Sequence, residues 1–129
     1  MLKSGILNPA INSLLSRVRH TNTLVIADRG FPYWPQIETI DISLVDDIPT
    51  VVDVLRAIRG NFVIGRAFFA DEYAEVNGPD ALELRLKELG GIECLRESHV
   101  DLKKRVPSAI GLIRTGDTTK YSNLILESA

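Results

Sequence analysis

The run Leu24–Ala27 constrains the fold most, because four successive apolar residues with no polar alternation are typical of a strand buried on both faces. Such a strand needs covering layers on both sides of its sheet. Asn8 followed by Pro9 predicts a helix start just before it, since asparagine caps helices and proline suits the first helical position. The apolar face of this helix ends near His20 and carries residues at helical spacing: Ile11, Leu14, Leu15 and Val18.

Strands and helices alternate through the rest of the chain. Further strands are expected over residues 37–45, 62–70, 92–95, 109–113 and 123–126. Further helices are expected from Pro49 to Gly60, from Asn77-Gly78-Pro79 to Gly90-Gly91, and from Ser98 to Lys104 before Pro107. This alternation predicts one α/β layered domain over residues 1–129, with a largely parallel or mixed central sheet.

Charge and composition narrow the range of partners. Fifteen basic and seventeen acidic residues give a net charge of −2, with no basic stripe of the kind that a nucleic-acid binder needs. The apolar runs are too short to span a membrane, and the N-terminus lacks the apolar core of a signal peptide. Cys94 is the only cysteine, which excludes an internal disulfide and a cysteine-based zinc site. A cytoplasmic protein is therefore expected.

Asp28 is the first candidate for chemistry, because ligands of open α/β sheets bind at the carboxyl ends of the strands. It follows the first strand and precedes a glycine and a loop that holds Phe31, Tyr33 and Trp34. A carboxylate beside aromatic side chains indicates a ligand-binding edge. The alternative is an aspartate that only caps a turn.

The two histidines stand at opposite kinds of helix end. His20 at a C-terminus would favour the imidazolium, whereas His99 at an N-terminus would favour the neutral ring. Opposed environments of this kind suit an acid and a base, although each histidine alone also fits an ordinary helix end. Both histidines with Asp28 would make a metal triad, but their spacing matches no established metal pattern.

The remaining motifs are less specific. No glycine-rich nucleotide loop and no G-x-S-x-G elbow occurs, so neither a nucleotide cofactor nor a serine nucleophile is predicted. Tyr121 and Asn123 would share one side of an extended chain, where a phenol and an amide suit a polyhydroxylated ligand. The alternative is that the two residues only decorate the entrance of a strand. Ordinary structural roles are expected elsewhere: Asp71-Glu72 at a solvated helix start, Cys94 as a buried small hydrophobe, and Arg85, Lys87 and Glu88 on a solvated helix face.

Four stretches together resemble the D-ribose pyranase and L-fucose mutarotase family (RbsD/FucU): GILNPAINSLLSRVRHTNTLVIADRGFP, IPTVVDVLRAI, ESHVDLKKR and IRTGDTTKYSNLIL. The resemblance covers nearly the whole chain, and the ordered combination is more specific than any single motif. It implies a three-layer α/β/α fold, no metal or organic cofactor, and ring-shaped homo-oligomers, commonly decamers, with the site between neighbouring subunits.

The resemblance also implies an activity and a set of site residues. His20 matches the family's proton donor, and five positions match its sugar-binding residues: Asp28, His99, Lys103, Tyr121 and Asn123. The expected enzyme is an isomerase that interconverts cyclic forms of a free sugar by acid/base ring opening and reclosure. The alternative is a non-catalytic sugar-binding or transport-accessory protein on the same scaffold. Arg29, where the family commonly has a small residue, and the bulky Tyr33-Trp34 loop leave the identity of the sugar open.

Overall fold

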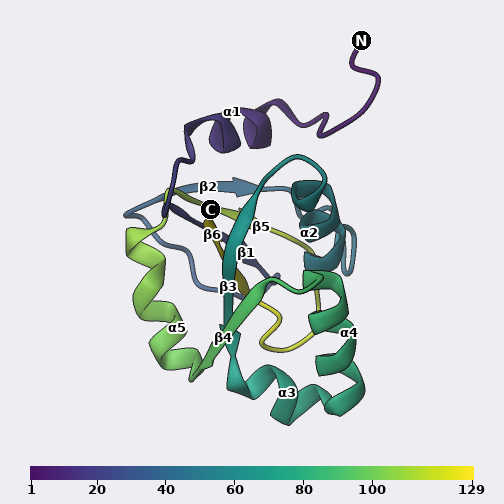
Figure 1. Ribbon diagram of the computed structural model, residues 1–129, viewed down its shortest axis with the longest axis vertical. Helices are drawn as coiled ribbons and strands as arrows, with labels where there is room; N and C mark the ends of the chain where they lie inside the picture. The colour runs from purple at the N-terminus through teal and green to yellow at the C-terminus, as the bar shows by residue number, and fades with distance from the viewer.

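The sheet of the computed structural model, which describes residues 1–129, has six strands in the order β2-β5-β1-β6-β3-β4 (Figure 1). Their bounds are β1 Thr23–Ala27, β2 Glu38–Asp41, β3 Ile64–Ala70, β4 Glu93–Glu97, β5 Gly111–Arg114 and β6 Leu124–Ser128. β6 is antiparallel to both of its neighbours, β1 and β3, whereas the other pairs are parallel. The mixed, largely parallel sheet expected from the sequence is confirmed.

Helices cover both faces of this sheet. Their bounds are α1 Pro9–Arg17, α2 Val51–Arg59, α3 Asp71–Asn77, α4 Pro79–Leu89 and α5 His99–Arg105, followed by a short 3₁₀ turn over Val106–Ser108. In Figure 1, α2 and α4 lie on one side of the strands and α5 lies on the other. The expected three-layer α/β/α arrangement is therefore confirmed. No helix has the length and apolar character required to cross a lipid bilayer.

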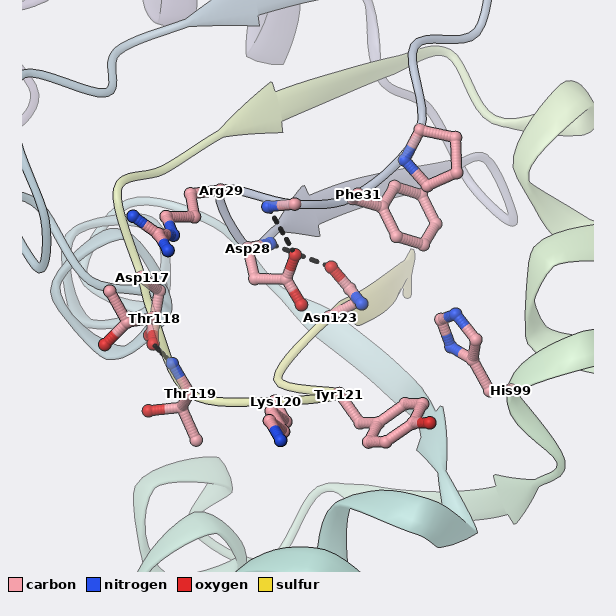
Figure 2. A pocket seen from close by; sticks show the side chains of 12 residues that line it. Asp28, Arg29, Phe31, His99, Asp117, Thr118, Thr119, Lys120, Tyr121 and Asn123 are labelled. Atoms are coloured by element: carbon pink, nitrogen blue, oxygen red, sulfur yellow. Dashed lines mark hydrogen bonds between the residues drawn. The ribbon is translucent and has the colours of Figure 1, made fainter.

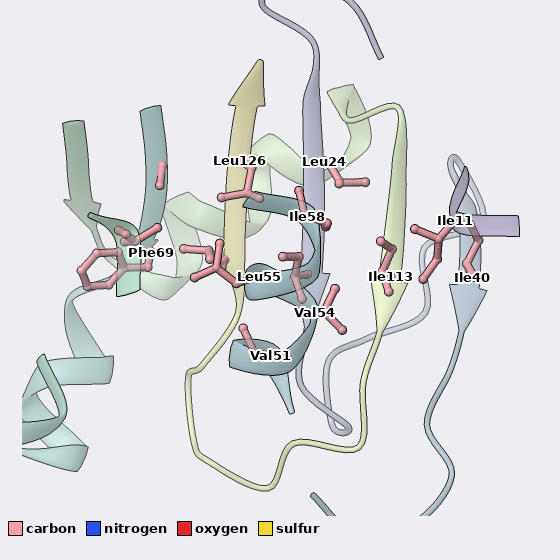
Figure 3. Close-up of a cluster of buried hydrophobic side chains, with 14 of the residues drawn as sticks. Ile11, Leu24, Ile40, Val51, Val54, Leu55, Ile58, Phe69, Ile113 and Leu126 are labelled. Carbon is pink, nitrogen blue, oxygen red and sulfur yellow. The ribbon is translucent and has the colours of Figure 1, made fainter. Parts of the chain in front are cut away.

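β1 lies in the middle of the core and is buried on both faces, as its apolar run predicts. Leu24 and Ile26 belong to a cluster that packs under α1 and α2, together with Leu55 and Ile58 (Figure 3). Val25 belongs to a second cluster, which packs under α5. Burying each such side chain contributes about 1.5–3 kcal/mol, so the strand is rigidly fixed between the two layers.

α2 begins at a capping box that the sequence encodes locally. The Thr50 hydroxyl accepts a hydrogen bond from the Asp53 N–H (3.2 Å), and the Asp53 carboxylate accepts one from the Thr50 N–H (2.9 Å). Such a box satisfies two of the donors that a helix leaves unpaired at its N-terminus. The first residues of α2 thereby gain a fixed position, which matters below because Val51 contacts the site.

Several element boundaries differ from the expectation. α1 ends at Arg17, because Val18 adopts an extended conformation and turns its side chain into the core. β2 covers residues 38–41 rather than 37–45, because the Ser43 N–H donates to the Asp41 carboxylate and turns the chain out of the sheet. β6 begins at Leu124, so Asn123 lies just before the strand. α3 extends the helix start expected at Asp71-Glu72 to a full helix.

Arg85 does not lie on a solvated face, and that expectation was wrong. Its side chain is buried because α3 packs against α4 and covers it. The guanidinium lies over the Tyr73 ring, 3.8 Å from its centroid, and donates to the Ser122 carbonyl oxygen (2.8 Å). Stacking on an aromatic ring stabilises a buried cation that has no carboxylate partner. Glu88, on the exposed side of the same helix, pairs with Arg56 as a surface residue should.

Candidate functional site

A pocket of about 470 Å³ opens at the edge of the sheet where β1 and β5 end and β6 begins (Figure 2). Three parts of the chain line it: residues 28–32 after β1, residues 117–121 with Asn123 between β5 and β6, and His99 at the start of α5. β1 and β5 are parallel, so their carboxyl ends necessarily meet at one edge. The fold therefore brings together four of the six predicted site residues: Asp28, His99, Tyr121 and Asn123.

Asp28 lies at the centre of the pocket in Figure 2. Its backbone N–H donates to Asn123 Oδ1 (2.8 Å), and its own Oδ1 accepts from the Gly30 N–H (3.0 Å). Burial raises the pKa of the Asp28 carboxyl above its ordinary value, and the nearby Asp117 charge raises it further, against the hydrogen bonds from Gly30 and Asn123. Asp28 thus caps its turn and also presents a carboxyl group that holds its proton more firmly than usual.

His99 faces Asp28 from α5, where Ser98 caps the helix by accepting from the Asp101 N–H (3.1 Å). The His99 ring meets the Tyr121 ring edge-on, with the centroids 5.1 Å apart, and its Nδ1 is buried without a hydrogen-bond partner. Burial lowers the pKa of His99, and the Lys103 ammonium lowers it further. The ring therefore favours the neutral form, the direction expected for a histidine at a helix start.

Glu72 holds the His99 segment from α3. One of its carboxylate oxygens accepts from the His99 backbone N–H (2.7 Å), so this residue is more than a solvated helix start. The same carboxylate opposes the lowering of the His99 pKa. α3 therefore takes part in positioning the pocket, a role that the sequence did not indicate.

Tyr121 and Asn123 both reach the pocket, but not as neighbours on an extended chain. Tyr121 has φ +58°, a left-handed turn conformation, and the strand starts only at Leu124. The turn is held from outside by Asn77, whose Nδ2 donates to the Lys120 carbonyl oxygen (2.9 Å). The expected placement on one side of an extended chain was therefore wrong, and the two side chains converge because the chain turns between them.

Asp117 is a pocket residue that the sequence analysis missed. Its carboxylate is buried and accepts from the Val51 N–H at the start of α2 (2.9 Å) and from the Thr119 N–H (2.8 Å). Its carbonyl oxygen accepts from the Arg29 N–H (3.0 Å). One residue thus joins α2 to two of the segments that line the pocket. Asp117 stands in the IRTGDTTKYSNLIL stretch, but the partners of its carboxylate are backbone groups, so nothing in that stretch marked it as a pocket residue.

Arg29 lies on the pocket rim, where its guanidinium pairs with Asp46 at 2.5 Å. The neighbouring Asp47 accepts from the backbone N–H (2.9 Å) and hydroxyl (2.8 Å) of Thr118. Two successive carboxylates therefore attach the loop after β2 to two segments of the rim, the one after β1 and the one after β5. Arg29, the residue that departs from the family pattern, contributes to the wall of the pocket through this contact.

His20 and Lys103 do not line the pocket. His20 is exposed in the turn before β1, whereas Asp28 directly follows that strand. Five strand residues at about 3.3 Å each separate the two by roughly 17 Å. Lys103 lies one helical turn beyond His99 and acts on its pKa. His20 and His99 do not meet within the chain, and no three histidine, cysteine, aspartate or glutamate side chains gather to hold a metal ion.

The fold and the pocket define a small α/β protein with a polar, sugar-sized pocket at the carboxyl edge of a mixed sheet. The chain belongs to the RbsD / FucU transport protein family, whose model matches residues 1–129. The resemblance noted in the sequence is thereby confirmed.

The sequences of known relatives match this chain over nearly their whole length. The chain is 39% identical to a D-ribose pyranase of Geobacillus kaustophilus over 128 residues, which are 99% of this chain and 93% of the relative. It is 35% identical to a D-ribose pyranase of Coprothermobacter proteolyticus, with 99% and 97% covered. The structure of Bacillus subtilis RbsD complexed with D-ribose matches with a TM-score of 0.93 and 29% identity, covering 100% of this chain and 98% of that one. The fucose mutarotase of Streptococcus pneumoniae in complex with L-fucose shares the fold, with a TM-score of 0.75 and 20% identity over 99% and 98% of the chains.

Proposed function

We propose that this chain is an isomerase that interconverts cyclic forms of a free monosaccharide, with residues 1–129 forming one pyranase/mutarotase domain. One observation carries the proposal: a carboxyl group, an imidazole, a phenol and an amide line the same pocket, from Asp28, His99, Tyr121 and Asn123. Together these groups donate to and accept from the hydroxyls of a sugar. The names of the D-ribose pyranase relatives support the same activity.

The reaction is a pair of proton transfers with no change in oxidation state. The anomeric hydroxyl loses its proton as the bond between the anomeric carbon and the ring oxygen breaks, and the ring oxygen gains a proton. The open-chain aldehyde then recloses on the same or another hydroxyl. A positioned acid or base contributes about 10²–10⁴-fold to such a step. In the proposal His20 supplies the proton, and the sugar hydroxyls are bound by Asp28, His99, Lys103, Tyr121 and Asn123.

The site is completed by a neighbouring subunit. His20 is exposed and lies roughly 17 Å from the pocket of its own chain, so it reaches a sugar only in the pocket of another copy. The contact then joins two different surfaces, and repeated contacts of this heterologous kind form a ring when the rotation from one copy to the next closes. A ring-shaped homo-oligomer follows, and the decamer is the size that the resemblance implies.

D-ribose is the first substrate to test. The relatives that are 35–39% identical carry the name D-ribose pyranase, and the RbsD structure with D-ribose has the higher TM-score, 0.93 against 0.75 for the mutarotase with L-fucose. Arg29 adds a cation to the rim and distinguishes this pocket from the family pattern. Because free sugars are converted where they are metabolised, we propose a cytoplasmic location.

Exchange NMR on D-ribose and L-fucose tests the activity. The protein is expected to speed the interconversion of D-ribose forms, and His20→Ala is expected to lose about 10²–10⁴-fold of that effect. The alternative, a sugar-binding protein without catalysis, predicts calorimetric binding of D-ribose with no change in the exchange rate. That result for the unaltered protein would overturn the proposal.

A further inference from the structure

Arg114, the last residue of β5, extends its guanidinium under the turn that follows β1. Its side chain is only 12% exposed. Nη1 lies 2.6 Å from the Phe31 carbonyl oxygen and 3.4 Å from those of Asp28 and Arg29, and Nη2 lies 3.2 Å from that of Pro32. The nearest carboxylate, Asp41, is 3.9 Å from Nε. Backbone carbonyl groups of the turn are therefore its main partners.

The turn needs these donors. No backbone N–H donates to the carbonyl oxygens of Arg29, Phe31 or Pro32, because the segment belongs to no helix or strand. Phe31 is buried, and a buried carbonyl group without a partner is costly. A single planar guanidinium presents several donors in a fixed fork and so serves this carbonyl group together with its neighbours. A lysine at the same place would keep the charge but would lack the fork.

The same turn sets the geometry of the pocket. It carries Asp28, whose carboxylate accepts from the Gly30 N–H two residues along the turn (3.0 Å). It also carries the buried Phe31 ring, which meets the His99 ring edge-on with the centroids 6.0 Å apart. A shift of the turn would displace the carboxyl group and loosen the contact with the imidazole together.

We infer that Arg114 is a positioning residue of the site: its guanidinium gathers the carbonyl groups of residues 28–32 and thereby holds the Asp28 carboxylate and the Phe31–His99 contact in place. The catalytic consequence rests on the proposed function, whereas the local geometry does not. Arg114 does not line the pocket and acts only through the turn.

Arg114→Lys is the test, with Arg66→Lys as the matched control. Arg66 also donates hydrogen bonds through its guanidinium, two of them to the Glu127 carboxylate at 2.9 and 3.2 Å, but it lies outside the pocket. Arg114→Lys is expected to lower kcat/KM on D-ribose on the order of 10²-fold, the cost of a reacting group displaced by about 1 Å. Arg66→Lys is expected to leave kcat/KM unchanged.

Two measurements test directly whether Arg114→Lys changes the conformation of the turn. Carbon NMR of Asp28 is expected to show its raised pKa falling toward the ordinary value in Arg114→Lys, because a loosened turn admits water. Emission from Trp34, the only tryptophan, is expected to move to longer wavelength, since its ring lies 6.1 Å from that of Phe31. If both readings stay at the values of the unaltered protein in a folded Arg114→Lys variant, the inference is overturned.

A third measurement uses the unaltered protein and therefore does not require any variant to fold. Nitrogen NMR of its arginine side chains is expected to show slow solvent exchange for the Arg114 guanidinium and fast exchange for the exposed Arg17. Fast exchange at Arg114 would overturn the inference. If the protein proves not to catalyse sugar interconversion, the proposed function fails, and the Asp28, Trp34 and nitrogen NMR readings still decide the role of Arg114.

Discussion

His20 and Asp28 stand at opposite ends of the same strand, because His20 lies in the turn that leads into β1 and Asp28 directly follows its last residue. The strand is buried on both faces and cannot fold back on itself to join them. Each chain thus presents a histidine at one end and an acid-lined pocket at the other. A sugar site that uses both of these residues has to be shared between chains.

Mixed assemblies test that sharing directly. His20→Ala is expected to lose about 10²–10⁴-fold of the exchange activity, because it removes the proposed proton donor. Asp28→Asn is expected to lose activity because it removes a proposed sugar-binding carboxylate. Because a shared site draws His20 from one chain and Asp28 from the next, random co-assembly is expected to restore roughly one quarter of the sites, one half times one half. Exchange NMR on D-ribose before and after co-refolding measures the recovery.

The control for this experiment is co-refolding of His20→Ala with itself, which should restore nothing. Native mass spectrometry establishes that the two variants occupy the same assembly. Mixed assemblies that stay inactive would contradict a site formed by two chains.

β1 was predictable because four apolar residues in a row leave few alternatives to a buried strand, and Asp28 was placed by the end of that run. The C-terminal end of α1 was not predictable from the sequence. Val18 fits both the apolar spacing of the helix and a place in the core, and only the tertiary packing selects its extended conformation. His20 consequently lies in a turn rather than at a helix end. The pattern gave the right spacing in sequence for the two residues, but it did not show that the strand holds them apart.

Asp28→Asn is also expected to stabilise the protein at neutral pH. Because the folded pKa of Asp28 is raised above 3.8, the folded state binds more protons than the unfolded chain, and stability falls as pH rises from 3.8 through the folded pKa. Asparagine removes the cost of burying the charge and keeps an oxygen to accept from the Gly30 N–H. Because solvent screens the half-buried carboxyl, we expect a gain of at most about 1 kcal/mol in the free energy of unfolding, accompanied by lost activity.

Thermal unfolding of both proteins at neutral pH and below pH 3.8 measures this effect. The gain should vanish at the acidic condition, where Asp28 is protonated in the folded and unfolded states alike. A variant that is less stable than the unaltered protein at neutral pH would show that the ionised carboxylate is favoured by its surroundings.

Lys103→Met is expected to raise the pKa of His99 toward 6.5, because the Lys103 ammonium is the second cause of its lowering, after burial. A histidine with a lowered pKa contributes stability above its unfolded value of 6.5, and this contribution is lost as pH falls through the folded pKa. The variant should therefore lose less stability on acidification below pH 6.5. If neutral His99 is the active form, the acidic limb of the rate profile should move to higher pH.

Proton NMR follows this titration easily, because the chain has only two histidines. Lys104→Met is the control, since the neighbouring Lys104 ammonium pairs with the exposed Asp101 (2.8 Å). It should leave the His99 titration in place. Equal shifts in both variants would mean that a general change in charge, rather than Lys103, sets the pKa of His99.

The residues hardest to find from the sequence were those whose partners are backbone groups or a second helix. Asp117 binds a backbone N–H group and Arg114 binds backbone carbonyl groups. Because nearly every residue has these groups, the sequence does not show which residues the two side chains contact. Arg85 looked solvated because α3, which covers it, has Tyr73 as its one buried side chain and hence no periodic apolar face. Local patterns identify elements and isolated chemistry, whereas these contacts exist only after the layers have assembled.

Gly116→Ala tests how closely the loop after β2 must approach the pocket. A Cβ at position 116 would collide with the Val45 carbonyl oxygen and lie 3.1 Å from that of Ile48, so the backbone of the loop would have to move. That loop carries Asp46 and Asp47, which hold Arg29 and Thr118 at the rim.

Overpacking of this kind is expected to lower the free energy of unfolding by about 1–3 kcal/mol, measured by denaturant titration, and to weaken D-ribose binding measured by calorimetry. The matched control is Gly60→Ala at the end of α2, where φ is −69° and the nearest atoms to an added Cβ are 3.7 and 3.8 Å away. This change fits the existing backbone and is expected to stabilise the chain by about 0.4–1 kcal/mol. If Gly116→Ala proves as stable as Gly60→Ala and binds D-ribose as the unaltered protein does, the close approach of the loop is not what shapes the rim.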